Sequence, residues 1–396
     1  MNDKQFHVKG VGLEGGRYQE LADAGGNSFR TWRSTQADKE LAAAKKHGFM
    51  VLMGLDIEKE LHGFDYNDEK AVAEQFERIK KVVDKYKDHP NVLAWAAGNE
   101  LNLLFNEKGG LKLVNPKTYK ALSDIVDYIH KVDPHHPVTT TFAGAAKDHV
   151  EHALKEVPQL DFLSFQMYGG VGEIANEVKK LGNGRPYMVT EFGPMGHWEM
   201  PSTKWGREIE EPGAVKARAF AKRMEKGIIN AKDGLQIGSY AFLWGQKQER
   251  TPTWYGFFHA DGTQTARLDE ITRLWTGKYP ENRAPLLESI SLDGKSATDN
   301  IYLKPATAYS AKIVVADPNG DKMTTKWTVM NEVKQKSDGG AFEKPPEELK
   351  FKIEKQAIDS ITFVTPTEPG DYRLFAYVYD GKGKVGDANI PFFVKE

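Results

Sequence analysis

The stretch VLAWAAGNE, Val92–Glu100, joins an apolar run to two polar residues. Its first five residues, Val92–Ala96, predict a strand that is buried on both faces. The chain then turns through Gly98 into an amide, Asn99, and a carboxylate, Glu100. A carboxylate is costly to desolvate at the end of a buried strand. We therefore expect this strand end to lie where an acidic group is needed.

Seven further apolar runs alternate with helical patterns between residue 6 and about residue 276. Amphipathic segments with apolar residues at i, i+3, i+4 and i+7 separate them, most clearly at Lys70–Tyr86, Thr118–Val132 and Ala214–Ile229. Eight strands, each followed by a helix, predict a (β/α)8 TIM barrel. A doubly wound open sheet is the alternative, because counting strands cannot show closure. The seven other runs are Phe6–Gly12, Asn27–Trp32, Phe49–Leu55, Pro137–Ala143, Asp161–Tyr168, Pro186–Phe192 and Gly238–Trp244.

The pattern changes after Trp275. The segment YPENRAP, residues 279–285, is typical of a linker, and short alternating runs with turn signals follow it. We predict a barrel domain over residues 1–278, a linker over 279–285 and an immunoglobulin-like β-sandwich without the disulfide over 286–396. EKPPEELKFK, Glu343–Lys352, is expected to be an exposed insert. DPNGD, Asp317–Asp321, is interpreted as a tight turn, with a calcium site as the alternative.

Composition excludes several classes of function. The chain has 396 residues, of which 54 are basic and 56 acidic, so its formal net charge is -2. This balance disfavours nucleic acid or an anionic membrane as the main partner. The absence of cysteine excludes disulfides, thiolate zinc sites and cysteine nucleophiles. No run approaches 18 apolar residues, so membrane insertion is not expected, and no acidic cluster has metal spacing. We predict neither a metal nor a cofactor.

Two carboxylates distinguish themselves among the strand ends. Glu100 and Glu191 each follow an apolar run directly, and in a barrel both would face one mouth. Such a pair can cleave a glycosidic bond, one group protonating the leaving oxygen and the other attacking or activating water. A charged Glu191 would raise the pKa of Glu100, which keeps Glu100 protonated as a general acid. Strand-end carboxylates also cap helices or pair with arginine, so this alternative stays open. The other strand-end residues are Glu14, Arg33, Asp56, Asn99, Gln166, Tyr168 and Trp244.

Four motifs resemble the catalytic barrels of clan A retaining glycoside hydrolases, in particular glycoside hydrolase family 2. HPNVLAWAAGNE, His89–Glu100, is similar to the fourth-strand motif of that family, and VTEFG, Val189–Gly193, to its seventh-strand motif. NSFRTW, Asn27–Trp32, is similar to the second-strand segment, and AFLW, Ala241–Trp244, to the eighth-strand segment. Family 2 enzymes carry further domains ahead of the barrel, so their detailed specificity is not carried over.

The resemblance implies roles for the matching residues. Glu100 would be the acid/base and Glu191 the nucleophile of a double displacement, with carboxyl groups about 5–5.5 Å apart. Asn99 would bind the sugar 2-hydroxyl, whereas Arg30 and Tyr168 would orient Glu191. Trp244 would present an apolar face to the sugar.

Aromatic residues also mark the segments that follow strands seven and eight. His197 and Trp198 in the first could stack on sugars, and a hydrophobic cluster beneath that loop is the alternative. Trp254 in the second could line outer subsites, and Gln166 at the end of strand six is predicted to bind substrate. The sequence thus predicts a β-glycoside hydrolase for an oligo- or polysaccharide, with a β-glucan as the expected substrate. A transglycosylase using the same residues and a non-catalytic carbohydrate-binding protein are the alternatives. The resemblance implies a periplasmic or extracellular location, and the sequence does not predict an oligomeric state.

Overall fold

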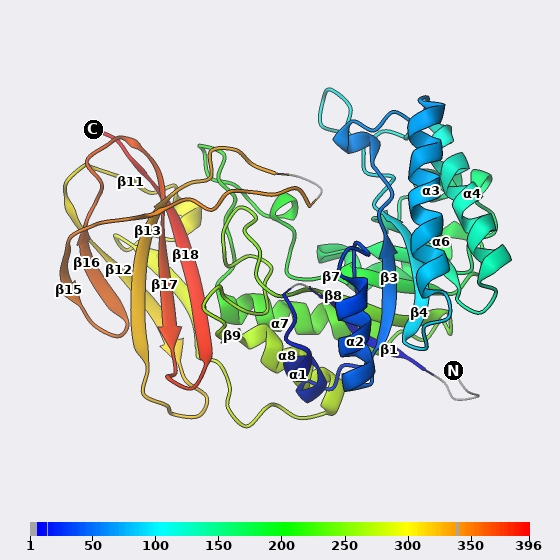
Figure 1. Ribbon diagram of the computed structural model, residues 1–396. Helices are drawn as coiled ribbons and strands as arrows, with labels where there is room; N and C mark the ends of the chain where they lie inside the picture. Colours follow the sequence, from blue (N-terminus) through cyan, green and yellow to red (C-terminus); the bar gives the residue numbers. More distant parts are fainter. Residues whose placement is uncertain (1–5, 14, 338–339) are drawn as a thin grey trace. The chain divides into compact units, whose positions relative to one another are not determined.

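Eight parallel strands form a closed barrel in the order in which they occur in the chain. The computed structural model describes residues 6–13, 15–337 and 340–396, and the strand-end residue Glu14 lies outside this part. All eight predicted strands are confirmed, and closure decides for the barrel against the open sheet. The barrel strands are β1 (Val8–Leu13), β2 (Ser28–Arg30), β3 (Met50–Leu55), β4 (Val92–Asn99), β5 (Val138–Ala143), β6 (Leu163–Gln166), β7 (Tyr187–Phe192) and β8 (Gln236–Trp244) (Figure 1).

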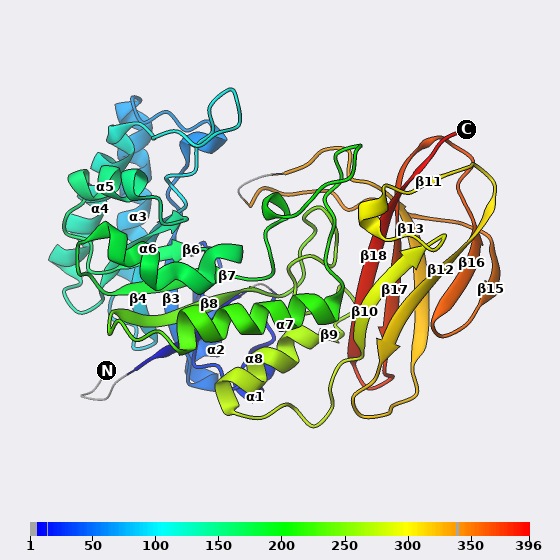
Figure 2. The same cartoon turned by 180° about the vertical axis from the view of Figure 1, so that it is seen from behind.

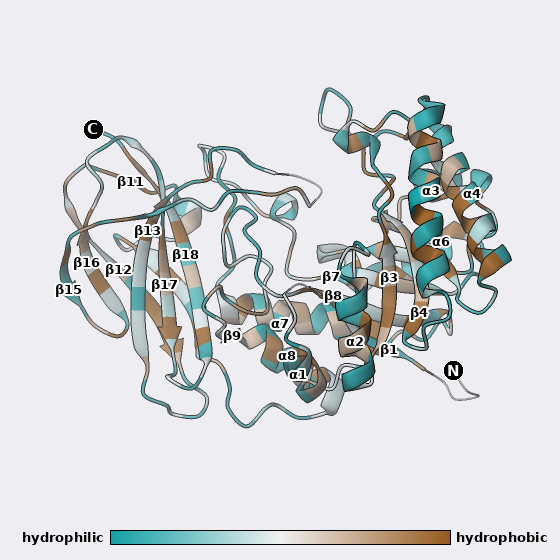
Figure 3. Cartoon of the chain, in the orientation of Figure 1, coloured by the Kyte–Doolittle hydropathy of each residue, from teal (hydrophilic) through white to brown (hydrophobic). Residues whose placement is uncertain are grey.

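Helices follow the strands, as the (β/α) repeat requires. In α3, Asp68 caps the first turn by accepting hydrogen bonds from two backbone N–H groups, and the helix buries Ile79 and Val83. Figure 2 shows α4, α5 and α6 together on one side of the strands. In Figure 3, β3 and β4 are largely hydrophobic, whereas α3 alternates between hydrophilic and hydrophobic residues. The helices are α1 (Tyr18–Asp23), α2 (Ala37–His47), α3 (Glu69–Tyr86), α4 (Pro116–Val132), α5 (Lys147–Glu156), α6 (Ile174–Leu181), α7 (Gly213–Met224) and α8 (Ala266–Thr276).

Short helical turns complete the connections. A π-helical turn, η4, continues α7 directly, so the predicted helix Ala214–Ile229 is one α-helix with a wider last turn. At Gly227 an added Cβ would lie 1.9 Å from the carbonyl oxygen of Val171, which explains why glycine stands there. The turns are η1 (Glu60–His62), η2 (Gly169–Glu173), η3 (His197–Glu199), η4 (Glu225–Ile229) and η5 (Ala297–Asp299).

Two further sheets, in which most neighbouring strands are antiparallel, follow the barrel in the sequence. One has the order β10-β12-β16-β15 and the other β11-β18-β17-β13-β14, with the short β9 beside β18. Alternate residues of both sheets contribute to one hydrophobic core, which includes Trp327, Phe363 and Phe392. Their strands are β9 (Gln264–Thr265), β10 (Leu286–Leu292), β11 (Tyr302–Leu303), β12 (Ala308–Ala316), β13 (Thr324–Asn331), β14 (Glu348–Leu349), β15 (Ile353–Gln356), β16 (Ser360–Val364), β17 (Gly370–Tyr379) and β18 (Lys384–Val394).

Packing divides the chain into two compact units. Unit 1 comprises residues up to Phe192 together with Arg223–Phe242, and unit 2 comprises Gly193–Lys222 together with Leu243–Glu396. Unit 1 therefore holds most of the barrel. Unit 2 holds the segments that follow β7 and β8, together with both sheets. The segment expected to be a linker is fastened inside unit 2, where the backbone N–H of Ala284 donates to Asp269 over 2.7 Å.

The expected exposed insert, Glu343–Lys352, is exposed over much of its length, as at Lys344, Pro345 and Glu347. Its first residue, Glu343, differs from this expectation because it is only 3% exposed. The DPNGD segment forms a turn in which the Asp317 carboxylate accepts hydrogen bonds from the backbone N–H groups of Asn319 and Asp321. This confirms the interpretation as a turn.

Candidate active site

Strand register in unit 1 brings the predicted residues together. Asn99 at the end of β4 stands opposite Thr141 of β5, and Gln166 at the end of β6 stands opposite Glu191 of β7. Because the strands are parallel, all of these positions lie towards their carboxyl ends. Arg30 ends β2 and reaches the same place, since its guanidinium donates to both Asn99 and Glu191.

Four donors converge on the carboxylate of Glu191. Oε1 accepts from Trp32 Nε1 at 2.7 Å, Gln166 Nε2 at 3.0 Å and Arg30 Nη1 at 3.3 Å. Oε2 accepts from the hydroxyl group of Tyr168 at 3.0 Å. An ionised carboxylate accepts on both oxygens, so this set of donors matches the anion. Glu191 is 5% exposed, which makes the fixed donors stronger partners than water would be.

The amide of Asn99 is oriented by its oxygen. Oδ1 accepts from Gln166 Nε2 at 2.6 Å, Arg30 Nη2 at 2.9 Å and Thr141 Oγ1 at 3.1 Å. The nitrogen must then point away from these donors. Among the described residues Nδ2 has no acceptor, so its two hydrogens are available to a ligand.

Glu100 follows in an unusual backbone conformation. Its φ of 52° lies in the left-handed region, where non-glycine residues are uncommon and cost about 1–3 kcal/mol. Its N–H donates to the carbonyl oxygen of Thr141 over 2.8 Å, which holds this conformation. The Lys59 ammonium lies 3.7 Å from Oε2, and the side chains of Lys59 and Glu100 are only 9% and 17% exposed.

Arg30 is the buried cation of the site. The residue is 1% exposed, and its guanidinium lies 5.1 Å from the centre of the Trp32 ring. Burial lowers the pKa of Arg30, whereas the charges of Glu191 and Glu100 act in the opposite direction. Both carboxylates therefore act electrostatically on one guanidinium. Arg30 and Tyr168, which were predicted to orient Glu191, both donate hydrogen bonds to its carboxylate.

Three residues of this cluster were not predicted: Trp32, Thr141 and Lys59. Trp32 stands two residues beyond Arg30, and alternation along the extended chain could have indicated it. Thr141 belongs to β5, whose threonines look like any β-branched strand residues. Lys59 lies in the connection between β3 and α3, where no sequence pattern marks it.

The aromatic residues predicted in unit 2 differ from one another in exposure. Trp244 is 0% exposed and packs against Phe257 and Phe258 at ring-centre distances of 5.4 and 5.2 Å. It therefore presents no face for stacking, contrary to expectation. His197 is buried, which fits the alternative of a hydrophobic cluster beneath its loop, and Trp254 is buried too. Trp198 is 60% exposed and keeps the predicted exposure.

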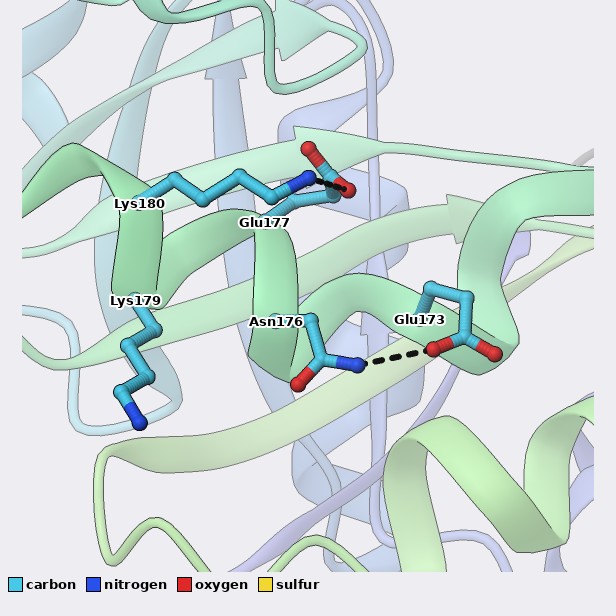
Figure 4. Close-up of a pocket in the computed structure, with 5 residues that line it drawn as sticks. All are labelled: Glu173, Asn176, Glu177, Lys179 and Lys180. Carbon is cyan, nitrogen blue, oxygen red and sulfur yellow. Dashed lines mark hydrogen bonds and ion pairs between the residues drawn. The ribbon is translucent and has the colours of Figure 1, made fainter.

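A second hollow lies away from these carboxylates, within unit 1. Figure 4 shows a hollow beside α6 that is lined by Glu173, Asn176, Glu177, Lys179 and Lys180. Lys180 pairs with Glu177 at 2.7 Å, and Asn176 donates to Glu173 at 2.8 Å, so four of the five lining side chains pair with one another. Within the described residues there is no cluster of three potential metal ligands of the His, Cys, Asp or Glu type. In the same part, no helix has the length and apolar character to cross a membrane.

Comparison with known proteins agrees with this geometry. Residues 25–202 match the model of the TIM barrel domain of glycosyl hydrolases family 2. A probable mannan endo-1,4-beta-mannosidase C of Aspergillus terreus is 29% identical over a region that covers 26% of this chain and 30% of that protein.

Solved structures share the fold. A beta-glucuronidase of Ruminococcus gnavus is 17% identical, with 70% of this chain and 51% of that chain covered and a TM-score of 0.53. A beta-D-glucuronidase of Dictyoglomus thermophilum is 16% identical, with 71% and 52% covered and a TM-score of 0.54. A putative beta-galactosidase of Bacteroides fragilis is 14% identical, with 100% and 56% covered and a TM-score of 0.50. This chain therefore spans about half of those structures and less of the mannosidase.

Proposed function

We propose that this chain, whose barrel is similar to the TIM barrel domain of family 2 clan A glycoside hydrolases, is a retaining β-glycoside hydrolase. The observation that carries the proposal is the joint orientation of Glu191 and Asn99 by one guanidinium, that of Arg30. A nucleophile that must attack one carbon and an amide that must bind the neighbouring hydroxyl need a fixed relative position. Arg30 is buried and supplies that position.

In the first step, an oxygen of Glu191 attacks the anomeric carbon, and the bond from that carbon to the leaving oxygen breaks. The proton of Glu100 moves to the leaving oxygen. Oε2 of Glu191 is the better placed oxygen, because it accepts one hydrogen bond from the described residues whereas Oε1 accepts three. Asn99 Nδ2 donates to the 2-hydroxyl group, and this contact strengthens as the sugar ring flattens.

In the second step, Glu100 takes a proton from water as the water oxygen attacks the anomeric carbon. The ester bond to Glu191 breaks and the carboxylate returns to its four donors. Two inversions at the same carbon give net retention. A sugar hydroxyl in place of water would give transglycosylation.

The proposed substrate is an oligo- or polysaccharide with a β-linkage. A β-glucan remains the first candidate, and a β-1,4-mannan is the second because the mannosidase relative is named for it. We further propose that the two sheets of unit 2 are an immunoglobulin-like sandwich and that the protein acts in the periplasm or outside the cell.

Turnover of 4-nitrophenyl β-glycosides tests the proposal. Glu191→Ala should lose about 10⁴-fold or more in kcat, and azide should restore turnover with a glycosyl azide of inverted configuration as product. Glu107→Ala, which removes an exposed carboxylate after β4, is the matched control and should keep full activity. Undiminished turnover in Glu191→Ala would refute the assigned nucleophile. A panel of linkage-defined β-glucans, mannans and galactans then identifies the sugar.

A further inference from the structure

The connection between β4 and α4, residues 100–115, carries a group of exposed apolar side chains within unit 1. Phe105 is 38% exposed, Leu111 46% and Leu113 47%. Among the described residues of unit 1, Ile229 is the one other large hydrophobic residue that is exposed to this extent. Single exposed apolar residues are ordinary on a protein surface, whereas several within one short loop indicate a binding surface.

The loop forms a short hairpin that presents these side chains together. Phe105 and Leu111 form an antiparallel bridge. Backbone hydrogen bonds of 2.8 and 2.9 Å join the residues on either side of this pair. The pair itself is therefore of the non-hydrogen-bonded kind, in which the two side chains lie closest to each other. Leu113 stands two residues beyond Leu111 and lies on the same face by alternation.

The two ends of the hairpin are fixed to the rest of unit 1. Asn102 is 2% exposed, and its amide uses both backbone groups of Ala143 at the end of β5. Nδ2 donates to the carbonyl oxygen over 3.0 Å, and Oδ1 accepts from the N–H at 2.9 Å. At the other end the carbonyl oxygen of the buried Val114 accepts from Nε2 of His152 at 2.9 Å. Figure 1 shows the loop, in cyan, projecting on the same side of unit 1 as η1.

One segment contacts both ends of this loop. Lys59 lies 3.7 Å from the carboxylate of Glu100, the first residue of the loop. The next residue, Glu60, accepts from the backbone N–H of Asn115, the last residue of the loop, at 2.7 Å. It also accepts from the hydroxyl group of Thr118 in α4 at 3.4 Å. The position of the hairpin is therefore linked to that of Glu100.

Glu100 determines which part of a substrate lies next to this loop. In the proposed reaction it protonates the leaving oxygen, so its carboxyl group lies beside the bond to the sugar that leaves. Glu191 instead attacks the anomeric carbon of the sugar that is retained. The loop that continues the chain from Glu100 therefore starts on the leaving side of the cleaved bond.

We propose that the apolar face formed by Phe105, Leu111 and Leu113 binds the sugar on the leaving side, with the Phe105 ring stacked on the apolar face of a pyranose. This rests on the proposed function, because it names a subsite of that reaction. Three side chains match the size of one or two sugar rings, whereas a stable interface between two protein chains needs about 20–30 residues on each side. Phe105 is then a residue that determines specificity for the leaving part of the substrate.

Phe105→Ala tests this subsite on two substrates that differ in the leaving part. For cellohexaose or mannohexaose, whichever the parent cleaves, kcat/KM should fall about tenfold, because the stacked ring is lost. For the β-glycosyl fluoride of the same sugar it should stay within about twofold of the parent, since the leaving group is a single atom. Phe105→Trp keeps an aromatic ring and should retain the activity on the hexaose.

Ile229→Ala is the matched control. Ile229 is 44% exposed but precedes β8, so it lies towards the opposite ends of the barrel strands, and both substrates should react as with the parent. An equal loss on both substrates in Phe105→Ala, or unchanged kcat/KM on the hexaose, would overturn the inference and leave the proposed hydrolase standing. A parent dimer that becomes a monomer in Phe105→Ala, seen by sedimentation velocity, would assign the face to a second copy of the chain and would also overturn it.

Binding without turnover separates this inference from the proposed function. Isothermal titration calorimetry should show the same hexaose binding to Glu191→Ala about tenfold more tightly than to the double variant Glu191→Ala/Phe105→Ala. If the parent cleaved no glycoside but this difference were found, the proposed hydrolase would fail and the sugar-binding face would stand. Equal dissociation constants, or no binding of either hexaose, would show that Phe105 does not hold a sugar.

Discussion

The ammonium group of Lys59 lies 3.7 Å from the carboxylate of Glu100, and both side chains are largely buried. A positive charge at this distance favours the ionised form of the carboxylate. Arg30 adds a second positive charge that interacts with Glu100. Both charges oppose the effect expected from Glu191, which would keep Glu100 protonated. The balance of these three charges is therefore a property of the structure that no single motif specifies.

Lys59→Met should move the basic limb of the pH profile of kcat/KM to higher pH. The first step needs Glu100 protonated, and removal of the ammonium group lets Glu100 keep its proton to higher pH. The direction of this movement follows from the loss of a positive charge 3.7 Å from the carboxylate. Lys108→Met, at an exposed position after β4, should leave the profile unchanged. A basic limb that stays in place in Lys59→Met would show that this ammonium group does not set the protonation of Glu100.

Trp32→Phe tests the 2.7 Å hydrogen bond from the indole to Glu191. Phenylalanine keeps much of the ring, which packs edge-on against Phe242, but removes the donor. We expect kcat to fall about tenfold or more, because one hydrogen bond to a charged group contributes about 1.5–3 kcal/mol. Tyr168→Phe removes the donor to the other oxygen and should give a loss of similar size. Full activity in both variants would exclude these donors as partners in the reaction.

Asn99 can be tested with the substrate as well as with the enzyme. Asn99→Ala should lose about 10²-fold or more in kcat/KM, since it removes the donor to the 2-hydroxyl and leaves donors from Arg30 and Gln166 unpaired. The parent enzyme should cleave a 2-deoxy aryl glycoside more slowly than the glycoside that has the 2-hydroxyl group. This loss of rate should be much smaller in Asn99→Ala. Independent, additive losses would show that Asn99 does not bind this hydroxyl.

The strands and the central residues of the site were predictable because their signals are local. Each barrel strand is one short apolar run, and parallel strands place their carboxyl ends together, so Glu100, Asn99 and Glu191 could be assigned to one mouth. The expected roles of Arg30 and Tyr168 beside Glu191 came from the resemblance of the motifs to a family and not from the positions of the strand ends.

The contacts that sequence reasoning missed are set by packing between distant segments. Glu343 lies in a stretch of charged residues and prolines, which is typical of an exposed loop, and only its partners Gln248 and Arg250, about 90 residues away, make it buried. Trp244 was expected to face the sugar, but Phe257 and Phe258 cover its ring. The position of Lys59 likewise depends on how the connection between β3 and α3 folds.

Glu40 of α2 yields a prediction about stability and pH. Its Oε2 is buried and has no partner among the described residues, and burial raises the pKa of Glu40 from 4.5 to about 7, with Lys39 acting in the opposite direction. The fold therefore disfavours the ionised form. As pH rises through 4.5 the unfolded chain releases this proton first, so stability falls between pH 4.5 and about 7 and stays lower above that.

Glu40→Gln removes the charge. The gain in stability of this variant over the parent should be larger at about pH 8 than at about pH 4. The gain is at most about 3 kcal/mol from the size of the shift, and smaller because the side chain is partly exposed. Urea unfolding at both pH values measures it. Glu74→Gln, on the exposed face of α3, should show no such difference between the two pH values, since its carboxylate is 70% exposed and pairs only at the surface with Lys70. If Glu40→Gln changed stability equally at both pH values, its effect would come from packing, and the Glu40 carboxylate would not be the group that makes the fold sensitive to pH in this range.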